Sequence, residues 1–334
     1  MVEFGGWRMP VQYSTIVEEH QCVRQAVGLF DIAHMGRLRF TGPDACRFLD
    51  SLVTNDVTKL EVGDIRYALV TNEHGGVLDD VLVYRFEDCY SLVVNASNRP
   101  KIVDWIEQHI AGFDVRMEDR TLSHAMVALQ GPQALAVIKA VGCGIAESLR
   151  YYSVTDADVG GIPGVVSRTG YTGEDGVEVI VETTRAMELW ERLVEKGAEF
   201  GLKPCGLGCR DTLRLEAAMP LYGHELSETI DPLTAGLAFG VKLAAEDFVG
   251  KAALLRIRDS GINRVRVGIE LEGRRIAREG ALVFLDGKQA GEVTSGTFSP
   301  TLEKSIAMGY IDKSLSEVGN QLEVDIRGKR VGAS

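Results

Sequence analysis

Two adjacent carboxylates, Asp79 and Asp80, stand in a segment that otherwise has the composition of a buried strand. The other residues of 77–84 are Val, Leu and Tyr, which pack well on a pleated surface. Because neighbouring strand residues point to opposite faces, we expect one aspartate to be directed away from the other. A buried carboxylate must be hydrogen-bonded, paired or used in chemistry, since burial of an unpaired charge is very costly. The pair is therefore a candidate site, and the alternative is a solvated pair that caps the Gly75-Gly76 turn.

The elements that must position these carboxylates are predicted to form an α+β fold. Segments 65–70 and 90–95 are typical of strands on either side of the aspartate strand, and the short loops between them favour antiparallel pairing. Asn98 and Pro100 are typical of a helix start. Further helices are predicted at 15–27 with Gly28 as the C-terminal cap, directly after Asp44, at 133–141 and around 187–194; further strands are predicted at 124–131, 164–169 and 177–181. Such blocks suit helices packed on antiparallel sheets.

The pattern changes after about residue 220. Short apolar runs at 265–271, 282–285 and 307–311, with an Asp286-Gly287 turn, predict an all-β terminal domain. A length of 334 residues suggests two or three domains in all.

The composition excludes several classes of function. A net charge of −12 argues against binding to nucleic acid, because phosphate contacts need clustered Lys and Arg. No apolar run approaches the ~20 residues that span a bilayer, and the N-terminus does not have the pattern of a signal peptide. The six cysteines are scattered and mostly flanked by apolar residues, which suits reduced thiols. We therefore expect a cytoplasmic protein without a membrane or nucleic-acid partner.

Metal and nucleotide sites are not expected either. Cys205 and Cys209 are four residues apart and could share a helix face, but Gly206 and Gly208 weaken a helix there. No His or third Cys lies near them in the sequence, while structural zinc sites use four ligands. No Walker-type phosphate loop and no dinucleotide glycine fingerprint occurs.

Six blocks in a fixed order carry a resemblance that covers nearly the whole chain. They are residues 6–10, 28–36, 72–80, 168–176, 206–217 and 294–302. With these blocks the chain resembles the aminomethyltransferase family, the T-proteins of the glycine cleavage system. The resemblance implies an α+β fold of three domains in a cloverleaf around a central folate channel. It divides the chain into a folate-binding domain (1–34 plus 121–217), an inserted ferredoxin-like domain (35–120), and a C-terminal all-β domain (218–334) that is barrel-like or jelly-roll-like.

The resemblance also implies a one-carbon transfer reaction. The lipoyl arm of the carrier called H-protein presents an aminomethyl group, tetrahydrofolate accepts the carbon as a cosubstrate, and ammonia leaves. The products are 5,10-methylenetetrahydrofolate and the reduced arm. Two alternatives stay open: a folate-dependent demethylase acting on another small amine, and a folate-binding regulatory protein without catalysis. A related iron–sulfur repair branch has a cysteine-centred motif where this chain has 169–173, without cysteine, which speaks against that branch.

Several residues match functional positions of that family. Asp80 falls at the catalytic carboxylate, which orients the folate and stabilises developing positive charge. Glu178 falls at the pterin-binding glutamate, since a carboxylate can accept two parallel hydrogen bonds from an amino group and a ring N–H. The remaining matches are the ligand-contacting Arg210 and the channel-lining Tyr67, Asn95, Tyr151 and Tyr171. For each of these a core or rim position is the alternative.

Two neighbouring groups receive structural interpretations. Asp79 is expected to close the Gly75-Gly76 turn, and Arg214 to pair with Glu216 or Asp211.

Docking of the carrier is expected to depend on local basic residues. The chain and the carrier would both be acidic, so Lys and Arg near the channel mouth should steer the encounter. The candidates are Lys242, Lys251, Arg274 and Arg275, with ordinary solvated charges as the alternative.

Overall fold

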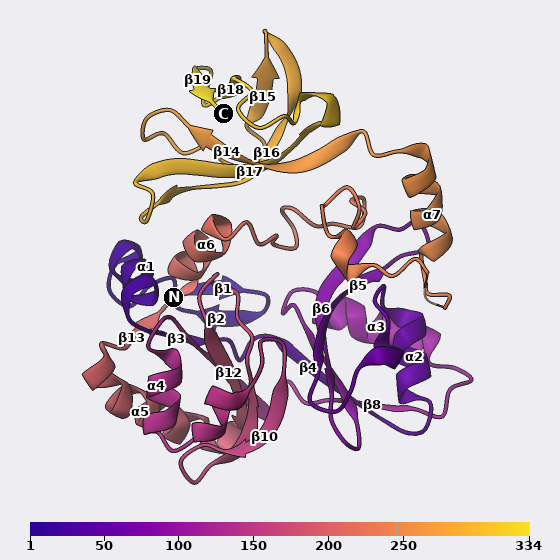
Figure 1. Cartoon of the computed structure of the whole chain (residues 1–334), viewed down its shortest axis with the longest axis vertical. Helices are drawn as coiled ribbons and strands as arrows, with labels where there is room; N and C mark the ends of the chain where they lie inside the picture. Colours follow the sequence, from indigo (N-terminus) through magenta and orange to yellow (C-terminus); the bar gives the residue numbers. More distant parts are fainter. Residues whose placement is uncertain (245) are drawn as a thin grey trace.

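The computed structural model describes residues 1–244 and 246–334, which form three lobes (Figure 1). The first lobe contains a six-stranded sheet in the order β10-β11-β12-β9-β3-β13. Only the β13–β3 pair is parallel among these strands. Its strands are β3 (Gly28–Asp31), β9 (His124–Gln130), β10 (Val154–Asp158), β11 (Pro163–Ser167), β12 (Gly176–Glu182) and β13 (Lys203–Cys205).

Alternating side chains give this sheet two apolar faces. Leu29, Val127 and Leu129 pack with the helices α4 (Ala134–Ala140) and α5 (Ala186–Gly197). Phe30 and Met126, one residue out of phase, pack on the opposite side with α1 (Ile16–Gln25) and α6 (Leu207–Glu216). This is the period-two pattern expected of a sheet covered on both sides. In the same cluster Ile32, directly after β3, packs with Ile65, Tyr84 and Val93 of the second lobe.

The second lobe is built around an antiparallel sheet in the order β5-β6-β7-β4-β8. Its elements are β4 (Gly36–Thr41), α2 (Ala45–Leu52), β5 (Ile65–Thr71), β6 (Val77–Arg85), β7 (Tyr90–Val94), α3 (Arg99–His109) and β8 (Arg116–Asp119). The helices α2 and α3 pack on one face, where Phe48, Leu49, Ile102 and Ile106 are buried. The predicted strands on either side of the aspartate strand and the helix after Asp44 are confirmed.

The third lobe is a closed six-stranded barrel, which confirms the predicted β-structure at the end of the chain. Its strands are β14 (Arg264–Leu271), β15 (Leu282–Leu285), β16 (Lys288–Ser299), β17 (Lys304–Asp312), β18 (Leu322–Asp325) and β19 (Arg330–Ala333). Asp286 and Gly287 have φ values of 50° and 77° and connect β15 to β16. Two consecutive positive φ angles are typical of the tight hairpin turn that the sequence predicted.

Two expectations about the fold are wrong. The part of the chain from about residue 220 onward is not all-β, because it contains the helix α7 (Lys251–Ser260), whose Leu254 packs with Leu69 and Val77 of the second lobe. Gly28 is not a helix cap, because α1 ends at Gln25 and Gly28 begins β3. A Cβ at Gly28 would lie 2.4 Å from Val23 Cγ2, so the glycine permits close packing of α1 on the sheet.

The remaining elements are short. They are β1 (Val2–Phe4), β2 (Trp7–Met9), and the 3₁₀ helices η1 (Val57–Lys59), η2 (Gly144–Ser148), η3 (Thr183–Arg185), η4 (Ala198–Phe200), η5 (Ala238–Gly240) and η6 (Lys313–Leu315). No helix in the described ranges is long and apolar enough to cross a membrane. All six cysteines are free thiols, as the sequence predicted.

Candidate functional site

A cavity of about 900 Å³ lies where the three lobes meet. The first lobe contributes Met126 and Glu178 to its wall, the second Asp80 and Asn95, and the barrel Ser295. This volume is at the upper end of the range for small-molecule sites. Six of the seven residues selected from the sequence line it: Tyr67, Asp80, Asn95, Tyr171, Glu178 and Arg210.

Asp80 lies on β6 and is partly exposed to the cavity. Its Oδ2 accepts a hydrogen bond from the Tyr67 hydroxyl at 3.2 Å, and its Oδ1 accepts one from Asn95 Nδ2 at 2.8 Å. Burial raises the pKa of Asp80, and the hydrogen bonds from Asn95 and Tyr67 oppose this shift. The carboxylate is thus held in one orientation at the cavity wall, as a group that orients a ligand must be.

Asp79 is fully buried on the other side of the same strand. It accepts hydrogen bonds from the backbone N–H of Asn95 at 2.9 Å, from Asn95 Nδ2 at 2.8 Å and from Asn98 Nδ2 at 2.6 Å. The expectation that Asp79 closes the Gly75-Gly76 turn is wrong. Asn72 Oδ1 does so, because it accepts the Gly76 N–H at 3.0 Å.

Glu178 and Arg210 form the polar end of the cavity. Glu178 on β12 is 6% exposed, and its Oε2 accepts the Thr169 hydroxyl at 2.5 Å. Burial raises the pKa of Glu178, while the Thr169 hydrogen bond and the charge of Arg210 oppose it. The Arg210 guanidinium lies 4.8 Å from the centre of the Tyr171 ring, and burial lowers its pKa. A carboxylate, a guanidinium and an aromatic face together suit a flat heterocycle with N–H donors and a carbonyl.

The tyrosines differ in their placement. Tyr67 stacks under Phe239 with ring centres 5.5 Å apart, and the Tyr171 hydroxyl donates to the Pro220 carbonyl at 2.5 Å. Tyr151 is 62% exposed and does not line the cavity, whereas Tyr152 does. Tyr152 has a φ of 62°, in the left-handed region that is uncommon for residues other than glycine. The sequence prediction for Tyr151 as a lining residue is therefore corrected to Tyr152.

Sequence reasoning missed many other lining residues, among them His34 and Phe239. His34 is 2% exposed, and burial, followed by the charges of Arg210 and Arg37, lowers its pKa to about 3. It is therefore a neutral imidazole at neutral pH. Its position inside one of the six blocks was the available signal. Phe239 lies on η5, before the barrel, and no motif or spacing in the sequence pointed to it.

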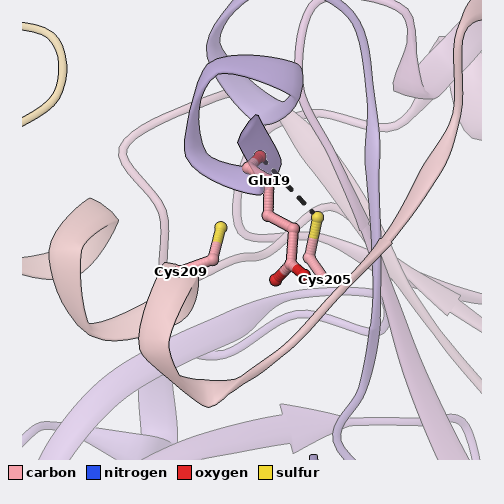
Figure 2. A group of neighbouring side chains, drawn as sticks. All are labelled: Glu19, Cys205 and Cys209. Carbon is pink, nitrogen blue, oxygen red and sulfur yellow. Dashed lines mark hydrogen bonds between the residues drawn. The ribbon is translucent and has the colours of Figure 1, made fainter. Parts of the chain in front are cut away.

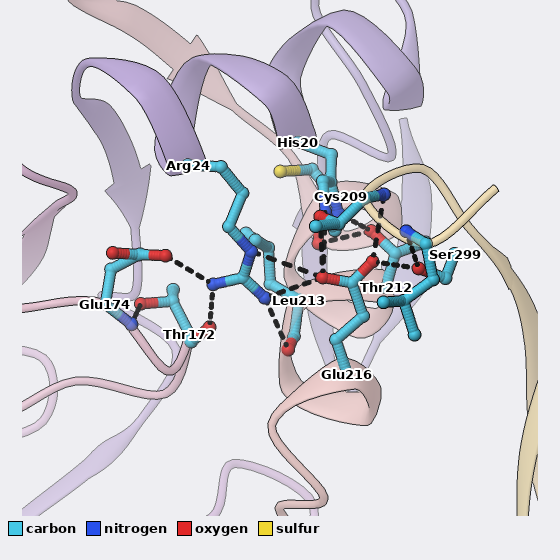
Figure 3. Close-up of polar contacts among 11 residues, drawn as sticks. His20, Arg24, Thr172, Glu174, Cys209, Thr212, Leu213, Glu216 and Ser299 are labelled. Atoms are coloured by element: carbon cyan, nitrogen blue, oxygen red, sulfur yellow. Dashed lines mark hydrogen bonds and ion pairs between the residues drawn. The ribbon is translucent and has the colours of Figure 1, made fainter.

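Of the two ion-pair partners predicted for Arg214, only Asp211 pairs with it among the described residues. Arg214 Nε pairs with Asp211 at 2.8 Å, as predicted, and its Nη1 pairs with Glu225 at 2.8 Å. Glu216 instead belongs to a second network, shown in Figure 3. It pairs with Arg24 Nη2 at 2.9 Å and His20 Nε2 at 3.1 Å, and it accepts the Ser299 hydroxyl. This network joins α1 and α6 to the barrel.

The two neighbouring cysteines lie beside a carboxylate that the sequence did not indicate. The side chains of Glu19, Cys205 and Cys209 meet within 4.8 Å (Figure 2). Glu19 is already occupied: Oε1 accepts the N–H groups of Tyr13 and Ser14 at 2.6 and 2.8 Å, and Oε2 accepts that of Gly206 at 2.8 Å. Glu19, Cys205 and Cys209 would supply three metal ligands, whereas structural zinc sites use four. The cluster's contacts connect the chain before α1 to the start of α6.

Two α+β lobes and a barrel around one cavity, with a few charged and polar groups in its wall, define a protein with a site for a sizeable ligand. Comparison with known families is specific. The family described as "GCVT N-terminal domain" matches residues 1–245, and the "Glycine cleavage T-protein C-terminal barrel domain" matches residues 264–334.

Full-length relatives agree. An aminomethyltransferase of Symbiobacterium thermophilum is 49% identical, over 100% of this chain and 91% of the relative. One of Bacillus cereus is 48% identical over 99% and 91%. The crystal structure of the glycine cleavage system aminomethyltransferase T from Bartonella henselae superposes with a TM-score of 0.93 at 34% identity, over 100% of this chain and 91% of that chain. The chain belongs to the glycine cleavage T-protein family, the aminomethyltransferases.

Proposed function

We propose that this aminomethyltransferase takes the aminomethyl group from the lipoyl arm of H-protein and transfers its carbon to tetrahydrofolate. The carbon–sulfur bond of the arm breaks, the thiol is regenerated, ammonia leaves, and two new bonds to folate nitrogens give 5,10-methylenetetrahydrofolate. The observation that supports this reaction best is that the Asp80 carboxylate and the Glu178–Arg210 end line one cavity. The groups that would recognise the ligand and the carboxylate that would act on the reacting carbon therefore lie in one site.

The pterin would bind at the Glu178–Arg210 end. Glu178 Oε1 has no donor among the described residues, so it can accept from the pterin amino group and ring N–H. Arg210 can donate to the pterin carbonyl, and Tyr67, Tyr171 and Tyr152 offer aromatic faces along the wall. Asn95 also lines the cavity, and its amide can hydrogen-bond to a polar edge of the ligand.

Asp80 would act on the transferred carbon. A carbon that leaves sulfur with the nitrogen's assistance is iminium-like and positive, and a fixed carboxylate stabilises such charge without reorganising. The same carboxylate can orient a folate N–H for attack, which places the reacting atoms together. Neutral His34 adds no competing positive charge to this region.

We also propose a division of the chain into three domains. Residues 1–34 with 121–217 would form the folate-binding domain, 35–120 a ferredoxin-like domain and the remainder the C-terminal domain, arranged as a cloverleaf around the folate channel. The membership of the three sheets supports this division. We place the reaction in the cytoplasm, where six free thiols remain reduced.

Carrier docking would use basic side chains around the barrel. Lys242, Arg274 and Arg275 are exposed, and Lys251 is partly exposed at the start of α7. Arg274 lies 5.0 Å from the Phe298 ring, which holds it on the barrel surface.

One experiment separates this function from the two alternatives. Enzyme in excess is mixed with tetrahydrofolate and either aminomethylated H-protein or a panel of small methylated amines, and methylenetetrahydrofolate and ammonia are quantified in a single turnover. The proposal expects product from the carrier alone. Product from a methylated amine instead would identify a demethylase, and folate binding without product from any donor would identify a non-catalytic protein.

A further inference from the structure

The amide of Asn95 connects the two aspartates. Asn95 Nδ2 lies 2.8 Å from Asp79 Oδ1 and 2.8 Å from Asp80 Oδ1. An amide nitrogen carries two hydrogens, so one is available for each carboxylate. The buried aspartate and the cavity aspartate, which lie on opposite faces of β6, thus have one donor in common at the end of β7.

This arrangement fixes which way the Asn95 amide faces. Asp79 also accepts hydrogen bonds from the Asn95 backbone N–H and from Asn98 Nδ2, and Asp80 accepts one from the Tyr67 hydroxyl. Both carboxylates thus act as acceptors, and the amide nitrogen faces them while the carbonyl oxygen faces away. Asn95 lines the cavity, and no donor in the described part of the chain reaches its Oδ1. The oxygen is therefore presented to whatever occupies the cavity, as an acceptor for an N–H group.

The Asp79 carboxylate is an unexpected group at its position. It is fully buried, and no Lys, Arg or His among the described residues pairs with it. Burying a charge without a cation is costly even when hydrogen bonds satisfy it. The three hydrogen bonds that Asp79 accepts offset part of that cost.

Asn98 provides an internal comparison. Its Nδ2 donates to Asp79 Oδ1 at 2.6 Å, as strongly as Asn95 does, yet it is buried before α3 and is not part of the cavity wall. Asp79 therefore has one partner that reaches the reacting region and one that does not.

We propose that Asp79 is a positioning residue for the transfer reaction: through Asn95 it fixes the Asp80 carboxylate and holds the Asn95 carbonyl toward an N–H of the bound cosubstrate. This inference rests on the proposed function. It assigns to Asp79 no contact with substrate, because the whole effect passes through the Asn95 side chain.

A double-mutant cycle tests the connection. The variants Asp79→Asn, Asn95→Ala and the pair are assayed by single-turnover transfer and by tetrahydrofolate titration. Asp79→Asn should lower the transfer rate constant about tenfold or more and raise the folate dissociation constant by no more than about fivefold, the effect of one neutral hydrogen bond. In the Asn95→Ala background the same substitution should have almost no further effect, because the connecting amide is gone. Additive losses in the cycle would overturn the proposal.

Asn98→Ala is the matched control, since it removes an equally short hydrogen bond to the same oxygen. It should lower the melting temperature while leaving the transfer rate constant within about twofold of the wild type. Equal rate losses in Asn98→Ala and Asp79→Asn would mean that Asp79 acts only on stability, and would overturn the proposal.

If the Asp79→Asn variant does not fold, a further variant still tests the proposal. Asn95→Gln keeps the amide but moves it by one methylene away from both carboxylates, so it should slow transfer with Asp79 intact; a wild-type rate would refute the bridge. The wild type is measured alongside. Absence of transfer in the wild type would contradict the proposed function itself, whereas an active wild type with an equally active Asp79→Asn variant contradicts only the role of Asp79.

Discussion

Glu178→Gln should weaken tetrahydrofolate binding without destabilising the fold. The substitution keeps the shape of a side chain that is 6% exposed and removes the charge that faces the pterin amino group in our proposal. A hydrogen bond to a charged group contributes about 1.5–3 kcal/mol, so the dissociation constant should rise about 10- to 150-fold. An amide also places a donor where the ligand has donors, which favours the upper part of this range.

Glu178→Gln should also change how the free energy of unfolding depends on pH. Because burial raises the pKa of Glu178, the ionised form is disfavoured in the folded protein at neutral pH. The wild type should therefore gain stability relative to Glu178→Gln as pH falls from neutral toward the unfolded value of about 4.5. Thermal unfolding between these pH values checks the sign.

Calorimetric titration with tetrahydrofolate is the assay for binding. Glu182→Gln is the matched control, because Glu182 ends the same strand and is exposed to solvent. It should bind folate as the wild type does. An unchanged dissociation constant in Glu178→Gln, or an equal loss in both variants, would remove Glu178 as the pterin anchor.

Three further predictions concern the aromatic wall, the Glu216 network and the carrier. Tyr152→Ala should weaken folate binding by about 1–3 kcal/mol in the same titration, whereas Tyr151→Ala should leave it unchanged; equal effects would contradict the correction to Tyr152. Burial raises the pKa of Glu216, but hydrogen bonds from His20, Ser299 and Arg24 lower it to about 2, so Glu216→Gln should lose about 2–3 kcal/mol of unfolding free energy at pH 7. That difference should shrink as pH falls from 4.5 toward 2, and chemical denaturation across this range checks it. Transfer from sub-saturating carrier should slow as salt rises to about 0.15 M, where screening acts within roughly 8 Å, while free aminomethyl-dihydrolipoamide should respond little; equal responses would exclude electrostatic steering.

Much of the fold could be predicted because it depends on local patterns. The strands around Asp80 are short and mostly apolar runs rich in Val, Leu and Tyr, and a two-residue turn such as Asp286-Gly287 specifies its hairpin. The helix α7 was missed because its apolar side packs against Leu69 and Val77, nearly 180 residues earlier in the chain. Gly28 was misinterpreted for a similar reason: the Val23 and Cys205 side chains that require a glycine there are visible only after folding.

The site could be predicted only as far as single residues match a family. Alternation correctly placed Asp79 and Asp80 on opposite faces of β6, but it could not show that one Asn95 amide reaches both. Tyr151 and Tyr152 are neighbours of the same residue type, so the sequence could not show which of them lines the cavity. Glu225, which pairs with Arg214, lies eleven residues further along the chain in an irregular segment, so helical spacing did not suggest it.

The most direct test of the account is single-turnover transfer by Asp80→Asn. The substitution preserves shape at a side chain that Tyr67 and Asn95 hold at the cavity wall, and it removes only the charge proposed to act on the transferred carbon. Removing one such preorganised group typically lowers a rate about 100- to 1,000-fold, so methylenetetrahydrofolate formation from aminomethylated H-protein should slow by that factor. The tetrahydrofolate dissociation constant should stay within a few-fold of the wild type. A near-normal transfer rate in Asp80→Asn would contradict the assignment of the reaction to this carboxylate.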